Sequence, residues 1–201
     1  MADAVLGITG KDFAILAADA TAGFSIIVMK QDEDKILNID KHKILAANGE
    51  NGDRVQFTEY VKKNLSLYKL NQEKSATTHA AAHFIRGELA TALRRRPYNT
   101  NLLLAGFDPE SNSSSLYFMD YLASMQKVKF GAHGYGAYFS LSLMDKYHKE
   151  DLTRDEGLSI VKACINEIQK RLILNSSNFT VKVVDKDGIH VVDMKDIKAI
   201  V

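Results

Sequence analysis

This chain has one cysteine and no excess of charge of either sign. Because Cys164 is alone among 201 residues, no disulfide can form within the chain, and nothing else in the sequence indicates an oxidising compartment. Lys and Arg number 26 against 25 Asp and Glu, so the formal net charge of +1 gives no overall attraction to nucleic acid or to an anionic membrane. We therefore expect partners to be recognised by shape and local chemistry.

Long apolar runs are also missing. The longest ones break after a handful of residues, far short of the roughly 20 that a membrane-spanning helix needs. Near the N-terminus, the apolar stretch from Ala4 to Ile8 is shorter than the core of an export signal, and Asp3 stands where such a signal carries a basic residue. We expect a soluble protein without an export signal, located in the cytoplasm and nucleus.

The sequence also lacks the marks of a boundary between domains. It has no proline-rich or glycine-rich linker and no repeat, and its most biased segment, PESNSSS at residues 109–115, is short enough for a surface turn. With 46% hydrophobic residues, a chain of this length can bury one substantial core. We therefore expect a single domain over residues 1–201.

Hydrophobic periodicity changes several times along the chain. Short or alternating apolar runs predict strands at residues 5–8, 13–18, 25–29, 36–39, 43–47, 101–107, 116–121, 126–130, 179–184 and 189–192. Apolar stripes with a spacing of three and four residues predict helices at residues 52–70, 75–96, 134–148 and from 153 through 172. The polar turn at residues 185–188 indicates a hairpin between the last two strands.

Local signals and the order of elements indicate the fold. Pro97 ends the second helix, and the arginines at 94–96 are expected near the negative end of its dipole. Thr153 and Glu156 make a capping box at the start of the fourth helix. Each helix has one apolar stripe to bury, and pairs of helices separate groups of strands. This order favours an α+β fold, a four-layer α-β-β-α sandwich of two stacked antiparallel sheets, although pattern alone leaves other α+β packings open.

Specific strings are more informative than periodicity. The chain carries ILAADATAG at 15–23, DKILNI at 34–39 and GENGDRVQF at 49–57. In these strings it resembles the beta subunits of the 20S proteasome, which are N-terminal-nucleophile hydrolases. A closer similarity to one subunit type of that family rests on GDRVQFTEYVKKN at 52–64, NLLLAGFD at 101–108, YFMDYLA at 117–123, GAHGYGA at 131–137 and VVDKDGI at 183–189. The resemblance spans nearly the whole chain and implies the sandwich described above, which is the fold of that family.

The resemblance also implies an active site that has lost its nucleophile. Active members of the family use an N-terminal threonine, whose hydroxyl attacks the peptide carbonyl while its free amine serves as the base. The spacing of the family places Asp3 at this position, and a carboxylate lacks the attacking hydroxyl. Because only Met1 and Ala2 precede Asp3, we expect no propeptide. Thr9 and Thr21 lie inside the chain, and cutting the chain to free either would remove part of the opening strands.

Other family positions are kept or replaced unevenly. Asp19 and Lys35 stand where the family has its buried acid and its lysine, and such a pair can persist as a structural salt bridge. Gly49 matches the position whose N–H holds the oxyanion, but we favour the simpler explanation of a tight turn into the following helix. Tyr135 replaces a serine, and the segment LNSSNFT at 174–180 lacks the Arg-Asp pair of active members. The resemblance thus implies degenerate active-site positions and no catalytic residue.

Other chemical signals are weaker than their structural explanations. His79 and His83 lie four residues apart on a predicted helix, a spacing that can chelate zinc, but no HExxH glutamate accompanies them. Cys164 falls in an apolar stripe, where cysteine is usually an inert hydrophobe. The basic run at 94–96 suits a helix end or a neighbouring subunit better than nucleic acid. The glycines of GAHGYGA lack the spacing of a dinucleotide fingerprint, so we expect no cofactor and no metal.

The sequence therefore predicts a non-catalytic structural subunit of the proteasome core, which helps to enclose the chamber of ubiquitin-dependent protein degradation. The resemblance implies contacts with beta subunits on both sides in the ring, with alpha-ring subunits and with the opposing beta ring. Candidate contact edges are residues 94–96 and 109–115. The apolar tail residues Ile197, Ile200 and Val201 are expected to pack on a partner. Two rival interpretations stay open, an active threonine-type peptidase and a free-standing binding module.

Overall fold

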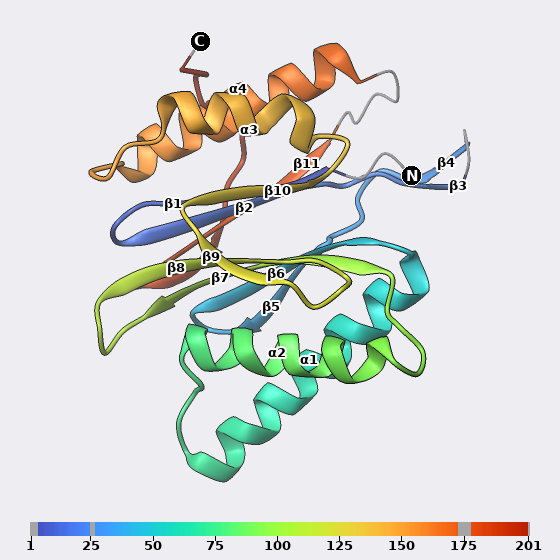
Figure 1. Ribbon diagram of the computed structural model, residues 1–201. Coiled ribbons are helices and arrows are strands. Elements are labelled where there is room, and N and C mark those ends of the chain that lie inside the picture. Colours follow the sequence, from blue (N-terminus) through green and yellow to red (C-terminus); the bar gives the residue numbers. More distant parts are fainter. Residues whose placement is uncertain (1–3, 25–26, 173–177, 201) are drawn as a thin grey trace.

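Two stacked sheets form the centre of the molecule, and a pair of helices covers each outer face. The computed structural model describes residues 4–24, 27–172 and 178–200. Within these residues, two five-stranded antiparallel sheets lie face to face (Figure 1). One outer face carries α3 (Ala137–Tyr147) and α4 (Arg154–Arg171), and the other carries α1 (Asn51–Gln72) and α2 (Thr78–Leu93). The predicted four-layer α-β-β-α sandwich is confirmed.

The first sheet combines the beginning and the end of the chain. Its strands, in spatial order, are β10 (Phe130–Gly134), β1 (Ala4–Thr9), β2 (Phe13–Asp19), β11 (Phe179–Asp185) and β12 (Gly188–Val191). In the turn from β11 to β12, Asp185 pairs with Gly188, whose φ of +125° favours glycine. The hairpin predicted at residues 185–188 is therefore confirmed.

The second sheet joins strands that are consecutive in the numbering. Its strands are β5 (Ile36–Asp40), β6 (Lys43–Gly49), β7 (Thr100–Asp108), β8 (Ser113–Met119) and β9 (Met125–Val128). The single strand predicted at 126–130 is wrong, because a bend at Lys129 separates β9 from β10 and sends the chain to the other sheet. An apolar run does not reveal such a change of sheet.

A separate hairpin projects from one end of the sandwich (Figure 1). It consists of β3 (Ala22–Phe24) and β4 (Ile27–Lys30), where the sequence predicts only one strand at 25–29. Residues 25 and 26 of that predicted strand lie outside the described residues. Strands of three and four residues are too short to show a periodicity of two.

Three apolar layers hold the four structural layers together, and β2 contributes to two of them. Leu16 belongs to the layer between the sheets, whereas its neighbour Ile15 belongs to the layer between the first sheet and α4. Successive side chains of a strand point to opposite faces, so a strand covered on both faces is a continuous apolar run such as FAILAAD. The third layer lies between the second sheet and the pair α1 and α2. In the described ranges, no helix combines the length and hydropathy that crossing a bilayer requires.

Helix α2 ends earlier than the sequence predicts. Its last residue is Leu93, and Arg95 N–H donates to the carbonyl of Ala92 at 2.9 Å, which tightens the chain into a turn. Pro97 disfavours helical geometry at the residue before it, so the helix cannot continue to that point. The prediction of a helix through residue 96 is therefore wrong, and the arginines at 94–96 follow the last helical turn.

The apolar stripe of α1 is only partly buried. Phe57 and Val61 lie in the layer against the second sheet and Leu65 lies at its margin, but Tyr68 is 47% exposed and Leu70 is 77% exposed. Figure 1 shows the reason, because the second half of α1 runs away from the sheet. The expectation that a sandwich buries every apolar stripe holds for the first half of α1 and is wrong for the second.

The C-terminal tail packs on its own chain. Met194 is buried in the layer that includes α4, and Ile197 is partly buried there. Lys162 on α4 donates from Nζ to the carbonyl of Met194 at 2.9 Å. Ile197 is therefore partly covered by its own chain, and Ile200, 41% exposed, donates its N–H to the carbonyl of Ser159 at 3.3 Å. Val201 lies outside the described residues, and contact of the tail with a partner stays a prediction.

One lysine ties the two sheets together. Lys182 on β11 of the first sheet is buried, and its ammonium reaches the segment at the start of β5 in the second sheet. Nζ donates to Asp34 Oδ2 at 2.6 Å, to Asn38 Oδ1 at 3.1 Å and to the carbonyl of Ile36. An ammonium has three N–H groups, so this buried charge is fully hydrogen-bonded. The residues that it holds lie on both sides of Lys35 in the sequence.

A neutral histidine lies between the sheets. His133 on β10 stacks on Phe118 with ring centroids 4.0 Å apart, and its Nε2 lies 3.1 Å from the carbonyl of Leu102 on β7. Burial lowers the pKa of His133 to about 4, against the opposing effect of the hydrogen bond to Leu102. The imidazole is therefore neutral at physiological pH, and it donates to Leu102 in the tautomer that carries the proton on Nε2.

This histidine predicts a loss of stability in acid. The pKa of His133 is about 4 in the folded chain and about 6.5 in the unfolded chain, so its contribution is complete above pH 6.5 and is lost as the pH falls toward 4. The free energy of unfolding falls by up to about 3 kcal/mol over this interval. We expect His133→Gln to lose less stability than the unmodified chain between pH 7 and pH 4.5 in urea unfolding. Parallel pH profiles for the two chains would contradict the assignment.

Candidate functional site

Three of the positions predicted to be degenerate active-site positions meet at one end of the sandwich. Asp19 ends β2, Lys35 immediately precedes β5 and Gly49 ends β6. The side chains of Asp19 and Lys35 are both buried. Thr21 connects them, because its N–H donates to Asp19 Oδ1 at 2.7 Å and its carbonyl accepts from Lys35 Nζ at 2.9 Å. Both side chains thus hold the backbone of Thr21.

Backbone geometry brings Gly49 to the same end and explains its presence. Ala47, two residues earlier on β6, donates its N–H to the carbonyl of Lys35 at 3.2 Å. Gly49 has a φ of +130°, and a Cβ atom at this position would collide with the carbonyl oxygen of Asn99. Since only glycine fits such a position, the geometry favours the tight turn into α1 as the reason for Gly49.

An ion pair that sequence patterns do not reveal lies at this end of the sheets. Arg54 in the first turns of α1 donates from Nη2 to Glu33 Oε1 at 2.9 Å, and Arg54 is buried. The hydrogen bond from Arg54 lowers the pKa of Glu33. Glu33 N–H donates to the carbonyl of Ala20, so the pair joins the segment next to Asp19 to the start of α1. The partners are 21 residues apart, and no periodicity links residues at that separation.

The remaining degenerate positions lie partly outside the described residues. Tyr135 is 60% exposed and follows Gly134, which pairs with Ala4 at the start of β1. Tyr135 is therefore close to the strand that leads to the expected nucleophile position. Asp3 itself lies outside the described residues, and so do residues 174–177 of the segment that lacks the second acid.

Neither internal threonine is placed to attack a peptide. Within the described part of the chain, Thr21 Oγ1 is buried without a hydrogen-bond partner, so no base is positioned to take its proton. Its nitrogen is an amide that donates to Asp19, not a free amine. Thr9 Oγ1 lies 3.1 Å from the carbonyl of Phe13 and 2.8 Å from Ser114 Oγ, which ties a turn to the neighbouring sheet.

The other side chains that bear reactive groups form no site among the described residues. Cys164 is buried, and burial raises the pKa of its thiol to about 12, so the nucleophilic thiolate does not form at neutral pH. His79 and His83 have ring centroids 4.3 Å apart, and His79 Nδ1 lies 3.2 Å from the hydroxyl of Tyr117. In the ranges that the structure describes, no three metal-ligating side chains converge on one point.

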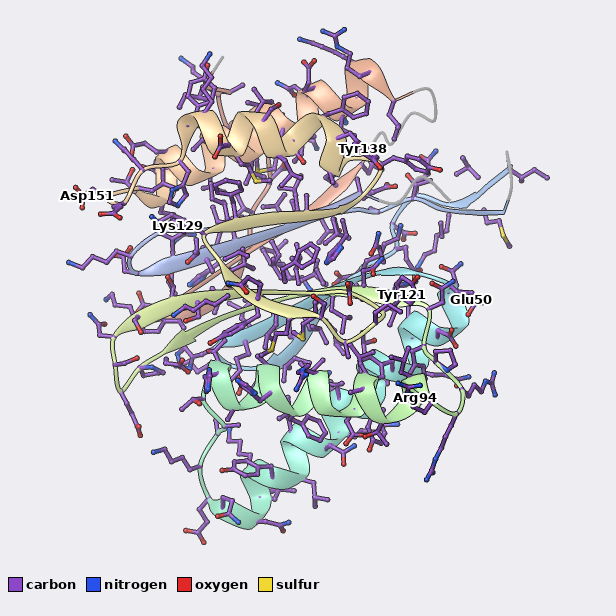
Figure 2. All side chains as sticks on the ribbon, viewed as in Figure 1. Glu50, Arg94, Tyr121, Lys129, Tyr138 and Asp151 are labelled. Atoms are coloured by element: carbon purple, nitrogen blue, oxygen red, sulfur yellow. The ribbon has the colours of Figure 1, made fainter. Side chains whose placement is uncertain are left out.

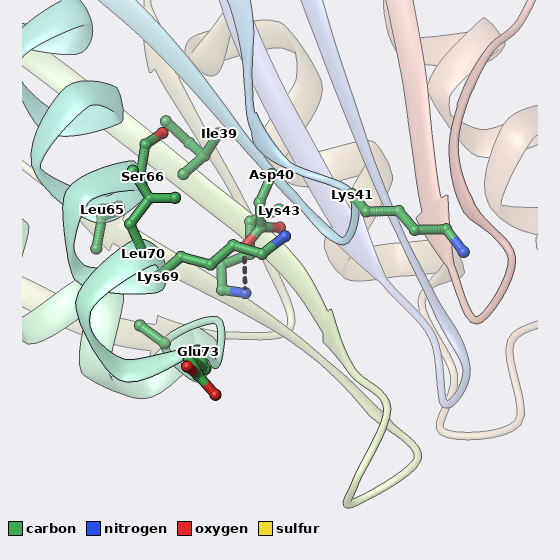
Figure 3. A pocket seen from close by; sticks show the side chains of 10 residues that line it. Ile39, Asp40, Lys41, Lys43, Leu65, Ser66, Lys69, Leu70 and Glu73 are labelled. Carbon is green, nitrogen blue, oxygen red and sulfur yellow. Dashed lines mark hydrogen bonds and ion pairs between the residues drawn. The ribbon is translucent and has the colours of Figure 1, made fainter.

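A cavity of about 560 Å³ lies between α1 and the turn from β5 to β6 (Figure 3). Its walls are apolar at Leu65 and charged at Lys69, and the buried Lys43 donates to Asp40 Oδ2 at 2.9 Å. None of the degenerate positions in the described ranges lines this cavity. It is therefore separate from the end of the sheets where Asp19 and Lys35 meet.

Comparison with known proteins finds similar sequences that cover most of the chain. The family described as Proteasome subunit matches residues 1–184. Proteasome subunit beta type-2-A of Arabidopsis thaliana is 54% identical over 186 residues, which cover 92% of this chain and 91% of that protein. Proteasome subunit beta type-2 of Oryza sativa subsp. japonica is 50% identical over 92% of this chain and 87% of its own length. Proteasome subunit beta type-4 of Saccharomyces cerevisiae is 39% identical over 95% of this chain and 97% of that protein.

A pair of glycine substitutions tests whether the backbone at position 49 requires glycine. Gly49→Ala should lower the free energy of unfolding by about 1–3 kcal/mol from backbone strain alone. Gly87→Ala is the control, because Gly87 lies inside α2 with open space around it, and alanine there should stabilise the chain by about 0.5–1 kcal/mol. Urea unfolding monitored by circular dichroism measures both. A Gly49→Ala chain as stable as the original would leave the turn without support.

Proposed function

The chain belongs to the proteasome subunit family, and we propose that it serves there as a non-catalytic beta subunit of the 20S core particle. Its similarity to the type-2 beta subunits of plants and to the type-4 subunit of yeast supports a place at the beta-4 position of the ring. In this role the chain completes an inner ring and helps to enclose the chamber in which neighbouring subunits degrade proteins. Its contribution is assembly.

The observation that carries this proposal is the lack of a nucleophile joined to a base. The spacing of the family assigns Asp3 to the position of the N-terminal threonine, and a carboxylate cannot form the acyl intermediate by hydroxyl attack. Among the described residues, the nearby hydroxyl of Thr21 has no hydrogen-bond partner that could act as its base. Asp19 and Lys35 both contact the backbone of Thr21, which is a structural use of these side chains.

An active threonine-type peptidase is the second candidate, because Asp19, Lys35 and Gly49 remain together. A lysine and an acid tune the proton affinity of a nucleophile, but they do not replace it. Gly49 is required by its backbone angle in either case. A free-standing binding module would keep the same fold, and the size of the particle in which the chain is found separates that interpretation from ours.

The surface of the chain supports several simultaneous partners. Large apolar side chains are exposed in groups on three elements: Ile27, Val28 and Met29 on β4, Leu67, Tyr68 and Leu70 near the end of α1, and Tyr138 and Leu141 on α3. Neighbouring exposed apolar side chains are typical of a surface that another chain covers. A ring of different subunits gives each member two different neighbours. We propose contacts with both beta neighbours, with alpha-ring subunits and with the opposing beta ring, in the cytoplasm and nucleus.

Native mass spectrometry tests this proposal directly. We expect the protein purified from its own cells to belong to a large multi-ring particle, and the chain released from that particle to be full length apart from removal of Met1. If the chain were found only as a monomer or in a small complex, the proposed role in the proteasome would be wrong. A chain that begins at a threonine would instead establish the peptidase.

Replacing Lys35 by methionine tests the absence of catalysis inside the particle. Each peptidase activity, normalised to assembled particle, should stay unchanged, whereas loss of the lysine from a working site lowers kcat by about 10²-fold or more. Normalisation is necessary because Lys35 is buried and its loss affects folding. Fluorogenic peptides of different specificity provide the measurement. Selective loss of one activity would assign that activity to this chain.

A further inference from the structure

The three arginines at 94–96 differ from the other arginines of the chain. Arg54, Arg154 and Arg171 each pair with a carboxylate, and Arg86 hydrogen-bonds to a backbone carbonyl. In the part of the chain that the structure describes, no ion pair or side-chain hydrogen bond involves the arginines at 94–96, and all three are exposed. The fold therefore leaves three adjacent guanidinium groups without an acid.

Two of these arginines lie at a concave surface. Arg95 and Arg96 line a pocket of about 350 Å³ between the start of α1 and the end of α2. Figure 2 shows Glu50, next to the start of α1, and Arg94, next to the end of α2, at the same end of the helical layer. Tyr98 forms a further part of the wall. We call this surface the basic pocket after Arg95 and Arg96, although two carboxylates, Asp53 and Glu88, also line it.

The acidic residues of the basic pocket are already engaged with neutral donors. Asp53 Oδ2 accepts the N–H of Asn99 at 2.9 Å. Glu88 Oε2 accepts the hydroxyl of Tyr60 at 3.0 Å. Both carboxylates line the same pocket as the arginines and yet pair with neither. Neither carboxylate lies within ion-pair distance of these guanidinium groups in the described structure, which leaves both groups available to an acid of another chain.

The backbone that carries the arginines is held in place. Arg95 N–H donates to the carbonyl of Ala92, and Pro97 fixes its own φ. The ring centroid of Tyr98 lies 4.8 Å from that of Phe57, a residue in the first half of α1. A loop that is fixed before binding loses little conformational entropy when a partner arrives.

We propose that the basic pocket binds an acidic segment of an adjacent subunit. The inference rests on the proposed function, because it takes the partner from the same particle. A guanidinium group matches a carboxylate in a bidentate geometry, and such pairs are stronger than those of an ammonium. Arginine and tyrosine are also among the residues that dominate the binding energy of interfaces.

Charge favours a protein partner over nucleic acid. The pocket contains two arginines and two carboxylates, so its formal charge is zero, and the whole chain has a net charge of +1. A polyanion is held by an extended positive surface that replaces many counterions. A few carboxylates on a neighbouring chain need only the local pairing that the two guanidinium groups provide.

A competition experiment tests the basic pocket in the assembled particle. A tagged chain with Arg95→Glu and Arg96→Glu is expressed beside the unmodified chain, and mass spectrometry measures the share of each in purified particles. We expect at least a tenfold loss of the variant. The control is Lys62→Glu with Lys63→Glu, the same change in charge on α1, which should enter the particle as the unmodified chain does. Equal losses for both variants, or no loss for the first, would overturn the assignment.

A zero-length cross-link identifies the partner even where charge reversal impairs folding. Arg96→Lys keeps the positive charge and supplies an amine that a carbodiimide couples to a carboxylate in contact with it. We expect a cross-link from position 96 to Asp or Glu of another subunit. Links only to acids of the same chain, or attachment of this segment to nucleic acid, would contradict the proposal. If the unmodified chain is absent from particles, the proposed function fails; if the chain is present without this link, only the inference fails.

Discussion

Cover on both faces of both sheets is the constraint on which the rest of the structure depends. The strand β2 shows it most clearly, because every residue of FAILAAD is buried, with alternate side chains in two different apolar layers. Neither sheet has a face that tolerates water, so each needs both the other sheet and its own pair of helices. The helices in turn have single apolar stripes that only a sheet of this size covers. Sequence, layers and topology therefore support one another.

Buried charged groups need partners inside such a structure, and this accounts for the geometry at the predicted active-site positions. Asp19 and Lys35 lie at strand ends, where the backbone of Thr21 offers both a donor and an acceptor. Lys182 on the first sheet hydrogen-bonds to residues on both sides of Lys35, at the start of β5 in the second sheet, with all three N–H groups engaged. A buried charge that loses its partner is costly. These side chains therefore have a reason to remain that is independent of catalysis.

Elements with strong local signals are predictable from the sequence, and contacts between distant segments are not. The helix α4 shows the first case, since its capping box at Thr153 and its apolar stripe both follow from neighbouring residues. The pair Glu33 and Arg54 shows the second, because two charged residues on different elements give no periodic signal. At the site, Asp19 and Lys35 are recognisable from the strings around them, but their shared contact with Thr21 depends on the folded backbone. The apolar tail is a similar case, because hydrophobicity alone does not indicate that Met194 packs against its own chain.

The second half of α1, which runs away from the sheet, is under different evolutionary constraints from the first half. Residues in its first half pack against the second sheet, so a substitution there changes the stability of the chain itself. Residues such as Leu67 and Leu70 contact little of their own fold, and their replacement leaves folding almost untouched. Substitutions at these positions are therefore constrained by the binding partners of the chain and not by its folding. Substitutions in the last two turns of α1 can therefore accumulate together with substitutions in the binding partner. The core residues evolve independently of both.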